Sequence, residues 1–240
     1  MIRAFHLALM WLTVLPLPNI KNLDDQLQAK AVYCFPLVGL CIGFILSLIL
    51  LSASFFDFWL VIFCAVLFWF VITGFLHADG LADLSDGLAA SHQNPDRLVE
   101  VMKDPHIGSM GVMMLVLLVI GKMLLFVSIL DHHYEWALVL IPAWARLGAC
   151  WWGCSLPPLT AGFAKQMFYQ VDQQYLLYWL AILMILSYQF APILLLTPLL
   201  LWAWKLFLKH RLHAVNGDAL GAGIEVSELA MLFMVCLFSF

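Results

Sequence analysis

The stretch SMGVMMLVLLVIGKMLLFVSIL, residues 109–130, decides the fold class of this chain. Lys122 is its one charged residue. A helix of about 20 apolar residues spans the hydrocarbon core of a bilayer, and in lipid a helix satisfies its backbone hydrogen bonds internally. The stretch therefore predicts a membrane-spanning helix.

Similar apolar stretches recur along the chain. Of the 240 residues, 65% are hydrophobic and 11% are charged, whereas soluble domains contain about 25% charged residues. So few charged side chains cannot cover a water-soluble globule of this size, which excludes that class. The expected spans are 31–54, 57–77, 109–130, 135–155, 174–190, 191–208 and a shorter one at 226–240.

These spans predict an all-α fold, a polytopic membrane helical bundle of about seven transmembrane helices. Residues 4–17 are apolar but short, and they are expected to lie at the interface or to dip into the membrane. Residues 95–104 have one apolar face and one polar face, which indicates a short interfacial helix. Residues 1–240 are expected to form a single integral membrane domain.

Lysine and arginine residues are distributed unevenly around the expected spans. Cytoplasmic loops of membrane proteins are enriched in these residues. With seven spans, the loops around 55–56, 131–134 and 189–192 contain none. The basic residues on the opposite side are Arg3, Lys21, Lys30, Arg97, Lys103, Lys165, Lys205, Lys209 and Arg211. The loops that we therefore expect in the cytoplasm are 1–30, 78–108, 156–173 and 209–225.

The segment HADGLADLSDG, residues 77–87, is rich in carboxylates. Asp79, Asp83 and Asp86 are spaced i, i+4 and i+7, so on a helix they share one face. No Lys or Arg between Lys30 and Arg97 neutralises them. Oxygen ligands suit Mg²⁺, Mn²⁺ or Ca²⁺, so the pattern indicates a metal site. The alternative is a solvated, charged helix end.

Neighbouring polar residues could complete this site. His77 is expected either as a catalytic group or as an accessory or interfacial histidine. Lys103 and Asp104 end the expected interfacial helix on the same side of the membrane, so they could serve the site as well.

A second polar stretch, NGDALGAGIEVSE, residues 216–228, falls on the same side. Asp218 and Glu225 are seven residues apart and share a face if the stretch is helical. Gly217 and Gly221 permit a phosphate or a sugar to approach the backbone closely. This stretch is therefore expected to join the site.

Lys122 and Arg146 lie inside expected membrane helices. Unpaired charge is expensive there. These residues are expected to neutralise carboxylates or to bind substrate phosphates, and a purely structural ion pair is the alternative.

Together these segments resemble the cobalamin synthase family, the adenosylcobinamide-GDP ribazoletransferases. GFLHADGLADLSDG, residues 74–87, is similar to the family pattern G-G-x-H-x-D-G-L-A-D-x-x-D-G, with Phe75 near the second glycine. Similar segments are LPLP at 15–18, FPLVG at 35–39, MKD at 102–104 and GDALGA at 217–222. Val14 and His106 depart from the family, which commonly has arginine at these two positions.

The resemblance implies a transferase that condenses adenosylcobinamide-GDP with α-ribazole, or its 5′-phosphate. The products are adenosylcobalamin, or its 5′-phosphate, and GMP, and Mg²⁺ is the implied cofactor. The implied metal ligands are Asp79, Asp83, Asp86 and Glu225. The implied proton acceptor is Asp104 or, as second candidate, His77. The implied substrate contacts are Lys103, Lys122, Arg146, Gly217, Asp218 and Gly221.

The resemblance also implies a place for the reaction. The expected location is the bacterial inner membrane, with the active site on the cytoplasmic face, formed by loops 78–108 and 209–225. The expected partners are the corrinoid nucleotide, the ribazole substrate and membrane lipids, with a homo-oligomer left open. Nucleic acid is not expected as a partner.

Two other functions compete with this reading. Asp83 to Gly87 also fits the D-x-x-D-G opening of CDP-alcohol phosphotransferases, but Ser91 replaces their downstream arginine and residues 217–225 argue against them. A cation transporter would also carry charges inside the membrane. Transporters often place such groups near the midplane, whereas the carboxylates here cluster at one face.

Overall fold

The computed structural model describes residues 1–21, 23–91, 95–159, 167–168 and 170–238. Lys165 lies outside these residues. The named elements of this part of the chain are all helical, which confirms the all-α class. They are α1 (Ile2–Leu12), α2 (Asp25–Val32), α3 (Phe35–Leu51), η1 (Ser52–Ser54), α4 (Phe58–Ile72), α5 (Leu76–Ser91), α6 (Pro95–Met102), α7 (Ser109–Asp131), η2 (Glu135–Val139), α8 (Ile141–Ser155), α10 (Gln174–Phe190), η3 (Pro192–Leu196), α11 (Thr197–Arg211) and α12 (Gly217–Leu237).

Fewer helices than expected are long enough to cross a membrane. In the described residues five segments are long and apolar enough: Phe35–Ser54, Ser109–Asp131, Glu135–Ser155, Pro192–Arg211 and Gly217–Leu237. The bent pair α4–α5 would bring the number to six if it counts as one span. The expected count of about seven is therefore not confirmed, partly because α10 is a shorter apolar helix.

The last span begins earlier than its hydropathy predicts. We expected it at 226–240, after a polar loop, but α12 starts at Gly217. Asn216 caps the helix, because its side-chain Oδ1 accepts the N–H of Ala219 at 2.9 Å. The polar stretch 217–225 is thus the first part of a membrane helix rather than a loop.

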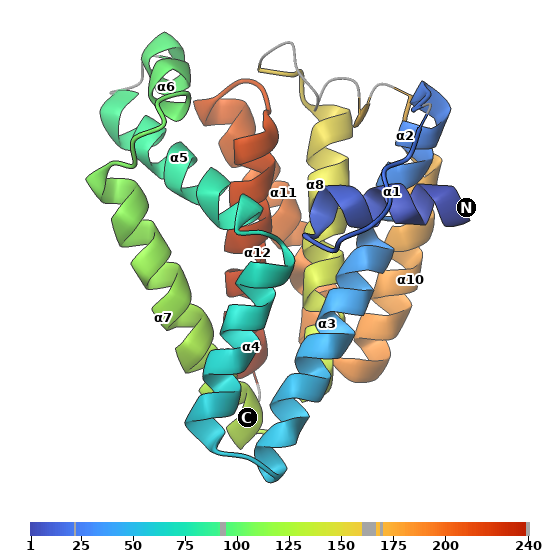
Figure 1. The fold of residues 1–240 in the computed structure, drawn as a ribbon, viewed down its shortest axis with the longest axis vertical. Coiled ribbons are helices and arrows are strands. Elements are labelled where there is room, and N and C mark those ends of the chain that lie inside the picture. Colours follow the sequence, from blue (N-terminus) through green and yellow to red (C-terminus); the bar gives the residue numbers. More distant parts are fainter. Residues whose placement is uncertain (22, 92–94, 160–166, 169, 239–240) are drawn as a thin grey trace.

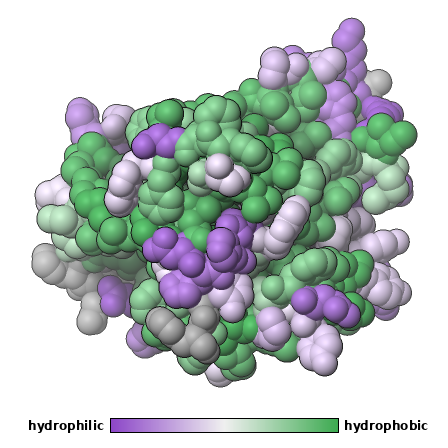
Figure 2. Space-filling view, turned by 90° about the horizontal axis from the view of Figure 1, so that it is seen from below, coloured by the Kyte–Doolittle hydropathy of each residue, from purple (hydrophilic) through white to green (hydrophobic). Residues whose placement is uncertain are grey.

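The outer surface of the bundle is apolar, as a lipid environment requires. Only 22% of the apolar window of α7 is buried within the protein, and large side chains such as Leu124 and Ile185 are exposed. A water-soluble protein rarely exposes apolar patches of this extent. Figure 2 views the bundle from its lower end and shows hydrophobic residues over much of that face, with hydrophilic residues near its middle and along its edges.

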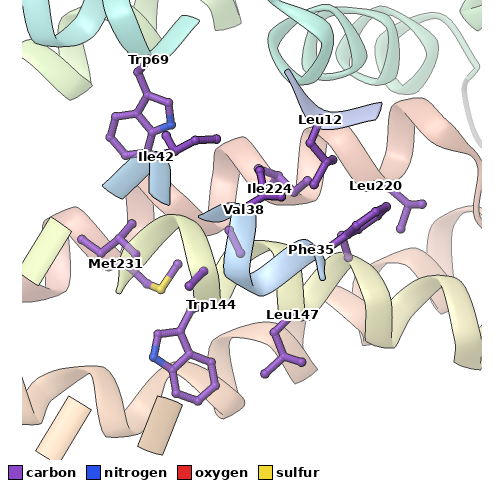
Figure 3. Packing of buried hydrophobic residues seen from close by; sticks show 14 of the residues in the cluster. Leu12, Phe35, Val38, Ile42, Trp69, Trp144, Leu147, Leu220, Ile224 and Met231 are labelled. Atoms are coloured by element: carbon purple, nitrogen blue, oxygen red, sulfur yellow. The ribbon is translucent and has the colours of Figure 1, made fainter. Parts of the chain in front are cut away.

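The interior forms where α3, α8 and α12 pack together (Figures 1 and 3). Trp144 of α8 is fully buried, and its indole N–H donates to the Ser187 hydroxyl of α10 at 2.9 Å. Ile42 of α3 and Met231 of α12 lie in the same apolar cluster. These contacts hold the long helices side by side, so they fix the frame on which the polar residues are placed.

A bend of 81° separates α4 from α5. Gly74 and Phe75 both adopt left-handed backbone conformations there, with φ of 60° and 59°. This conformation favours glycine over residues with a side chain. A left-handed backbone at this position is consistent with the second glycine of the family pattern, which lies near Phe75. The N–H of Val14 donates to the carbonyl of Ile72 at 2.9 Å, so the segment after α1 is held against the bend.

The two ends of the bundle differ. In Figure 1, α2, α6 and the start of α12 lie toward the upper end, while the α3–α4 connection and the C-terminus lie at the lower end. α1 lies across the other helices near the upper end. The two polar segments therefore meet at the end where the basic loops were expected.

Candidate functional site

The acidic segment forms helix α5, as its spacing predicts, and α5 packs against α12. The two backbones touch at Gly80, where a Cβ atom would lie 2.7 Å from the carbonyl oxygen of Asp218. Such an approach is possible only without a side chain. Gly80 therefore brings Asp218 beside the α5 aspartates that flank it, Asp79 and Asp83.

Four carboxylates gather at this crossing. Asp83 interacts electrostatically with three other carboxylates, those of Asp79, Asp218 and Asp86. Asp218 also interacts with Asp79. Like charges this close disfavour one another unless a cation or a proton neutralises them. The space between α5 and α12 is therefore a place where a cation or a proton would relieve this repulsion.

Asp86 has a second partner that the sequence did not predict. Its carboxylate accepts the N–H of Gly108 at 2.7 Å and that of Gly111 at 2.9 Å, so it caps the N-terminus of α7. A carboxylate has about four acceptor positions, so these bonds do not exhaust it. Asp86 thus ties α5 to α7 while it remains part of the acidic group.

The carboxylate oxygens of this cluster are ligands of the kind that Mg²⁺ prefers, but they do not surround a metal ion completely. Among the described residues no three His, Cys, Asp or Glu side chains are close enough together to hold a metal ion. Mg²⁺ is usually bound by one or two carboxylates together with water and substrate phosphates. The cluster therefore suits an ion that arrives with, or is completed by, a phosphate-bearing substrate.

The α5–α12 crossing makes a prediction about Gly80. Gly80→Ala places a methyl group against backbone that cannot rotate away, so we expect a loss of about 1–3 kcal/mol in the free energy of unfolding. Thermal unfolding in detergent measures it. Gly217→Ala is the matched control for stability, because a Cβ there meets nothing within 4 Å. Equal unfolding temperatures for both variants would contradict the close crossing.

Lys103 and Asp104 are exposed in the turn after α6. The Asp104 carboxylate accepts the backbone N–H of His106 at 3.0 Å, and its Oδ1 lies 2.7 Å from the ring Nδ1 of the same residue. These bonds hold the pKa of Asp104 below its ordinary value, which makes it a weaker base. The following residues reach the cluster, because Gly108 is bonded to Asp86.

A cavity of about 340 Å³ opens beside Asp218. It is enclosed by α1, α3, α5, α8, α12 and residues 167–168, and it is mostly apolar. Gly217, Gly221 and His77 line it as well, so three of the expected substrate-binding residues and one expected catalytic residue meet there. This cavity is the best candidate for a substrate pocket in the described part of the chain.

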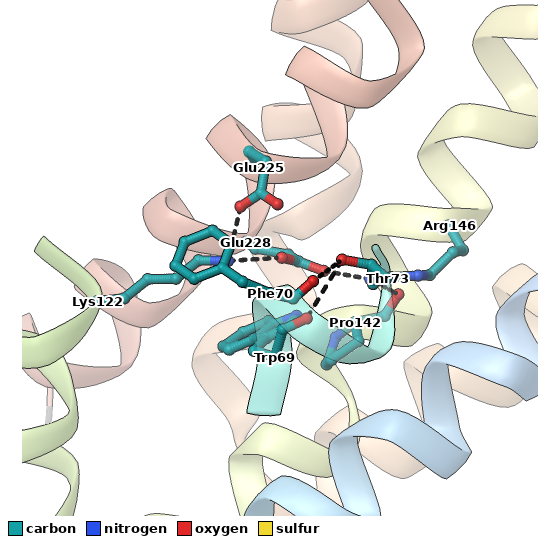
Figure 4. A network of polar contacts seen from close by, with 8 residues as sticks. All are labelled: Trp69, Phe70, Thr73, Lys122, Pro142, Arg146, Glu225 and Glu228. Atoms are coloured by element: carbon teal, nitrogen blue, oxygen red, sulfur yellow. Dashed lines mark hydrogen bonds and ion pairs between the residues drawn. The ribbon is translucent and has the colours of Figure 1, made fainter. Parts of the chain in front are cut away.

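Lys122 and Arg146 lie elsewhere, in a buried ionic network (Figure 4). Lys122 Nζ donates to Glu225 at 2.6 Å and to Glu228 at 3.1 Å. Arg146 pairs with the other oxygen of Glu228. Lys122 also lies 3.9 Å from the centre of the Trp69 ring. The network joins α7, α8 and α12 and balances two positive with two negative charges.

This network bears on three of the expected roles. Glu225, an expected metal ligand, is 2% exposed and is paired with Lys122, so it lies apart from the aspartates of α5. The observed contacts of Lys122 and Arg146 are ion pairs with Glu225 and Glu228, which fit both the expected neutralisation of carboxylates and the alternative of a purely structural ion pair. Both side chains are completely buried, and their role as phosphate contacts stays a prediction.

Glu228 and Asn216 lie in the polar stretch 216–228, but the sequence assigned neither a role, and it did not identify the aromatic walls of the cavity. Asn216 orients Asp218, because its amide donates to the Asp218 carboxylate at 2.8 Å. The role of Glu228 could have been predicted from the sequence by matching charges inside the membrane helices. With the last span extended to Gly217, the buried Glu225 and Glu228 both stand inside it, and they match the two buried basic residues Lys122 and Arg146. No signal in the sequence indicated which aromatic residues would meet.

Comparisons with known proteins show the family to which this chain belongs. A model of the cobalamin-5-phosphate synthase family matches residues 4–236. The adenosylcobinamide-GDP ribazoletransferase of Laribacter hongkongensis is 42% identical over 97% of this chain and 96% of its own length. Those of Thiobacillus denitrificans and Novosphingobium aromaticivorans are 39% and 37% identical, over 97% and 98% of this chain and 94% and 96% of their own. No solved structure matches significantly. With a full-length family match and relatives this similar, the chain belongs to the cobalamin-5-phosphate synthase family.

Proposed function

We propose that this protein is a membrane-embedded transferase that joins adenosylcobinamide-GDP to α-ribazole, or to its 5′-phosphate, and releases GMP. The observation that carries the proposal is the meeting of α5 and α12, where Asp79, Asp83, Asp86 and Asp218 gather beside a nucleoside-sized cavity. The similar proteins from Laribacter hongkongensis and Thiobacillus denitrificans are named adenosylcobinamide-GDP ribazoletransferase.

The chemistry requires little beyond alignment and charge neutralisation. The ribazole hydroxyl attacks the phosphorus next to the cobinamide, a new P–O bond forms, and the P–O bond to GMP breaks. GMP leaves with the electron pair of that bond. Bound Mg²⁺ would stabilise the charge that develops on the diphosphate.

The residues of this chain have separate tasks in that scheme. Asp79 and Asp83 would hold the metal with the substrate diphosphate, and Asp86 would support them while it caps α7. A carboxylate or imidazole that is not bound to metal would accept the hydroxyl proton, and Asp104 and His77 remain predictions for this role. Lys103, in the same exposed turn as Asp104, is retained as a phosphate contact.

The proposal places the site at the cytoplasmic face of a bacterial inner membrane. Lys209 and Arg211 end α11 just before α12 begins, at the end of the bundle where Asp218 lies. Basic residues mark the cytoplasmic side of membrane proteins. Water-soluble corrinoid nucleotides would reach the acidic cluster from that side, while lipids cover the apolar outer surface.

Release of GMP by the purified protein tests the function. We expect GMP only when adenosylcobinamide-GDP, α-ribazole and Mg²⁺ are all present, and we expect EDTA to abolish it, because the acidic cluster needs a cation. The assay runs in detergent, where no ion gradient exists, so a transporter would give no GMP. A CDP-alcohol and its acceptor alcohol are offered in parallel. If the protein is a phospholipid enzyme, it reacts with these substrates and releases no GMP from adenosylcobinamide-GDP.

A further inference from the structure

The proposed reaction needs two binding regions of very different size. One substrate is a corrinoid macrocycle that carries a nucleoside diphosphate, and the other is a single nucleoside with a flat aromatic base. The cavity beside Asp218 has about 340 Å³. This volume is near the lower end of the roughly 300–1,000 Å³ range of small-molecule sites. It suits the nucleoside and is too small for the macrocycle.

The walls of the cavity suit a flat aromatic ring. Phe35 of α3, Trp11 of α1 and Phe168 all line it. The rings of Phe35 and Trp11 meet edge to face, with centroids 6.2 Å apart. Aromatic rings prefer edge-to-face or offset stacking on other rings. A base that enters between these side chains would therefore find apolar surface and aromatic neighbours.

Polar groups also line the same cavity. Asn216, Gly217 and Asp218 line it where α12 begins. His77 lines the cavity from α5, and it is only 4% exposed. Its Nε2 has no hydrogen-bond partner within the described part of the chain. An unsatisfied buried polar group destabilises the folded protein, so a ligand that hydrogen-bonds to Nε2 would offset this loss.

Asp218 belongs both to the cavity and to the acidic cluster. It lines the cavity, and Asp79 and Asp83 flank the glycine that touches its backbone. A sugar beside Asp218 would therefore present its hydroxyl group to the carboxylates where the diphosphate is expected. The exposed side of α5 is left for the larger substrate.

We propose that this cavity is the ribazole site, with the aromatic base between Phe35 and Phe168 and the ribose at Asp218. Nε2 of His77 is the hydrogen-bond partner of the nucleoside. The inference rests on the proposed transfer reaction, and it adds which of the two substrates each region binds.

Filling the cavity tests the inference. Ala149 of α8 lines it and is 3% exposed. We expect Ala149→Leu to raise KM for α-ribazole by about 10- to 100-fold, the usual effect of added bulk in an apolar pocket. KM for adenosylcobinamide-GDP should stay unchanged within error. Cys154→Leu is the matched control, because it adds a similar side chain to the same helix outside the cavity lining.

Equilibrium dialysis of α-ribazole against the purified protein, without the corrinoid substrate, separates this inference from the proposed reaction. One outcome is that the unaltered protein binds ribazole, that Ala149→Leu abolishes this binding, and that no GMP is released under any condition. In that case the proposed reaction is wrong and the cavity assignment stands. If GMP is released but Ala149→Leu raises KM for the corrinoid substrate instead, the cavity assignment is wrong. Unchanged ribazole binding in Ala149→Leu overturns it too.

A second variant covers the case in which Ala149→Leu does not fold. Phe35→Leu keeps an apolar side chain but removes one ring from the wall. We expect about 2- to 10-fold weaker ribazole binding, because one aromatic contact with the base is lost. Ribazole affinity equal to that of the unaltered protein would count against the site.

Discussion

Asp83→Asn is expected to reduce GMP release at saturating substrate by at least about 100-fold, which corresponds to about 2.7 kcal/mol of lost transition-state stabilisation. Asp83 feels the charges of Asp79, Asp86 and Asp218, so it lies at the centre of the cluster that would hold the metal. The asparagine has nearly the same shape but carries no negative charge. Initial rates of GMP release at several Mg²⁺ concentrations measure the effect.

Glu100→Gln is the matched control for this experiment. It removes one negative charge from α6, where Glu100 makes an exposed ion pair with Arg97 at 2.9 Å. Exposed pairs of this kind contribute about 0–1 kcal/mol to stability, so folding and GMP release should change little. Full Mg²⁺-dependent transfer by folded Asp83→Asn protein would show that Asp83 is not a metal ligand.

Glu228→Gln is expected to cost about 3–5 kcal/mol of stability, because it leaves a buried charge without its partner. Glu228 is completely buried and bridges Lys122 and Arg146. Replacing it by glutamine leaves two positive charges facing the one negative charge of Glu225. Unfolding followed by tryptophan fluorescence in detergent should show a lowered midpoint temperature.

Restoring charge balance tests the cause of that loss. In Arg146→Met combined with Glu228→Leu, the Lys122–Glu225 pair remains and the unbalanced charge is gone. Apolar side chains often replace a buried ion pair at little cost, so we expect the double variant to unfold at a higher temperature than Glu228→Gln. A double variant less stable than Glu228→Gln would mean that lost packing, not lost charge balance, explains the effect.

Much of the secondary structure could be predicted from the sequence. The spans at 109–130 and 135–155 agree with α7 and with η2–α8, because long apolar stretches have a single low-energy form in lipid. The span at 57–77 was only partly right. α4 ends at Ile72, and the bend at Gly74 and Phe75 turns the chain by 81°. Hydropathy reports how apolar a segment is but not the direction of its axis.

The start of the last span was missed for a related reason. Asp218, Glu225 and Glu228 lower the hydropathy of residues 217–228, so the segment resembles a loop when it is read alone. In the folded chain Lys122, from a helix 103 residues earlier, neutralises Glu225. A polar segment can then enter the membrane, because its charges are paired within the protein.

The sequence by itself determined that this chain is a helical membrane protein with three aspartates on one helix face. Both properties are local: the first depends on apolar length and the second on a spacing of i, i+4 and i+7 within α5. The sequence also led us to expect both Asp218 and Glu225 at that site. Only the tertiary structure decided that Asp218 lies beside those aspartates while Glu225 pairs with Lys122, and that a cavity lies beside them. Those outcomes depend on which distant helices touch, and helix packing in lipid is set by side-chain shape and buried charge pairs rather than by hydropathy.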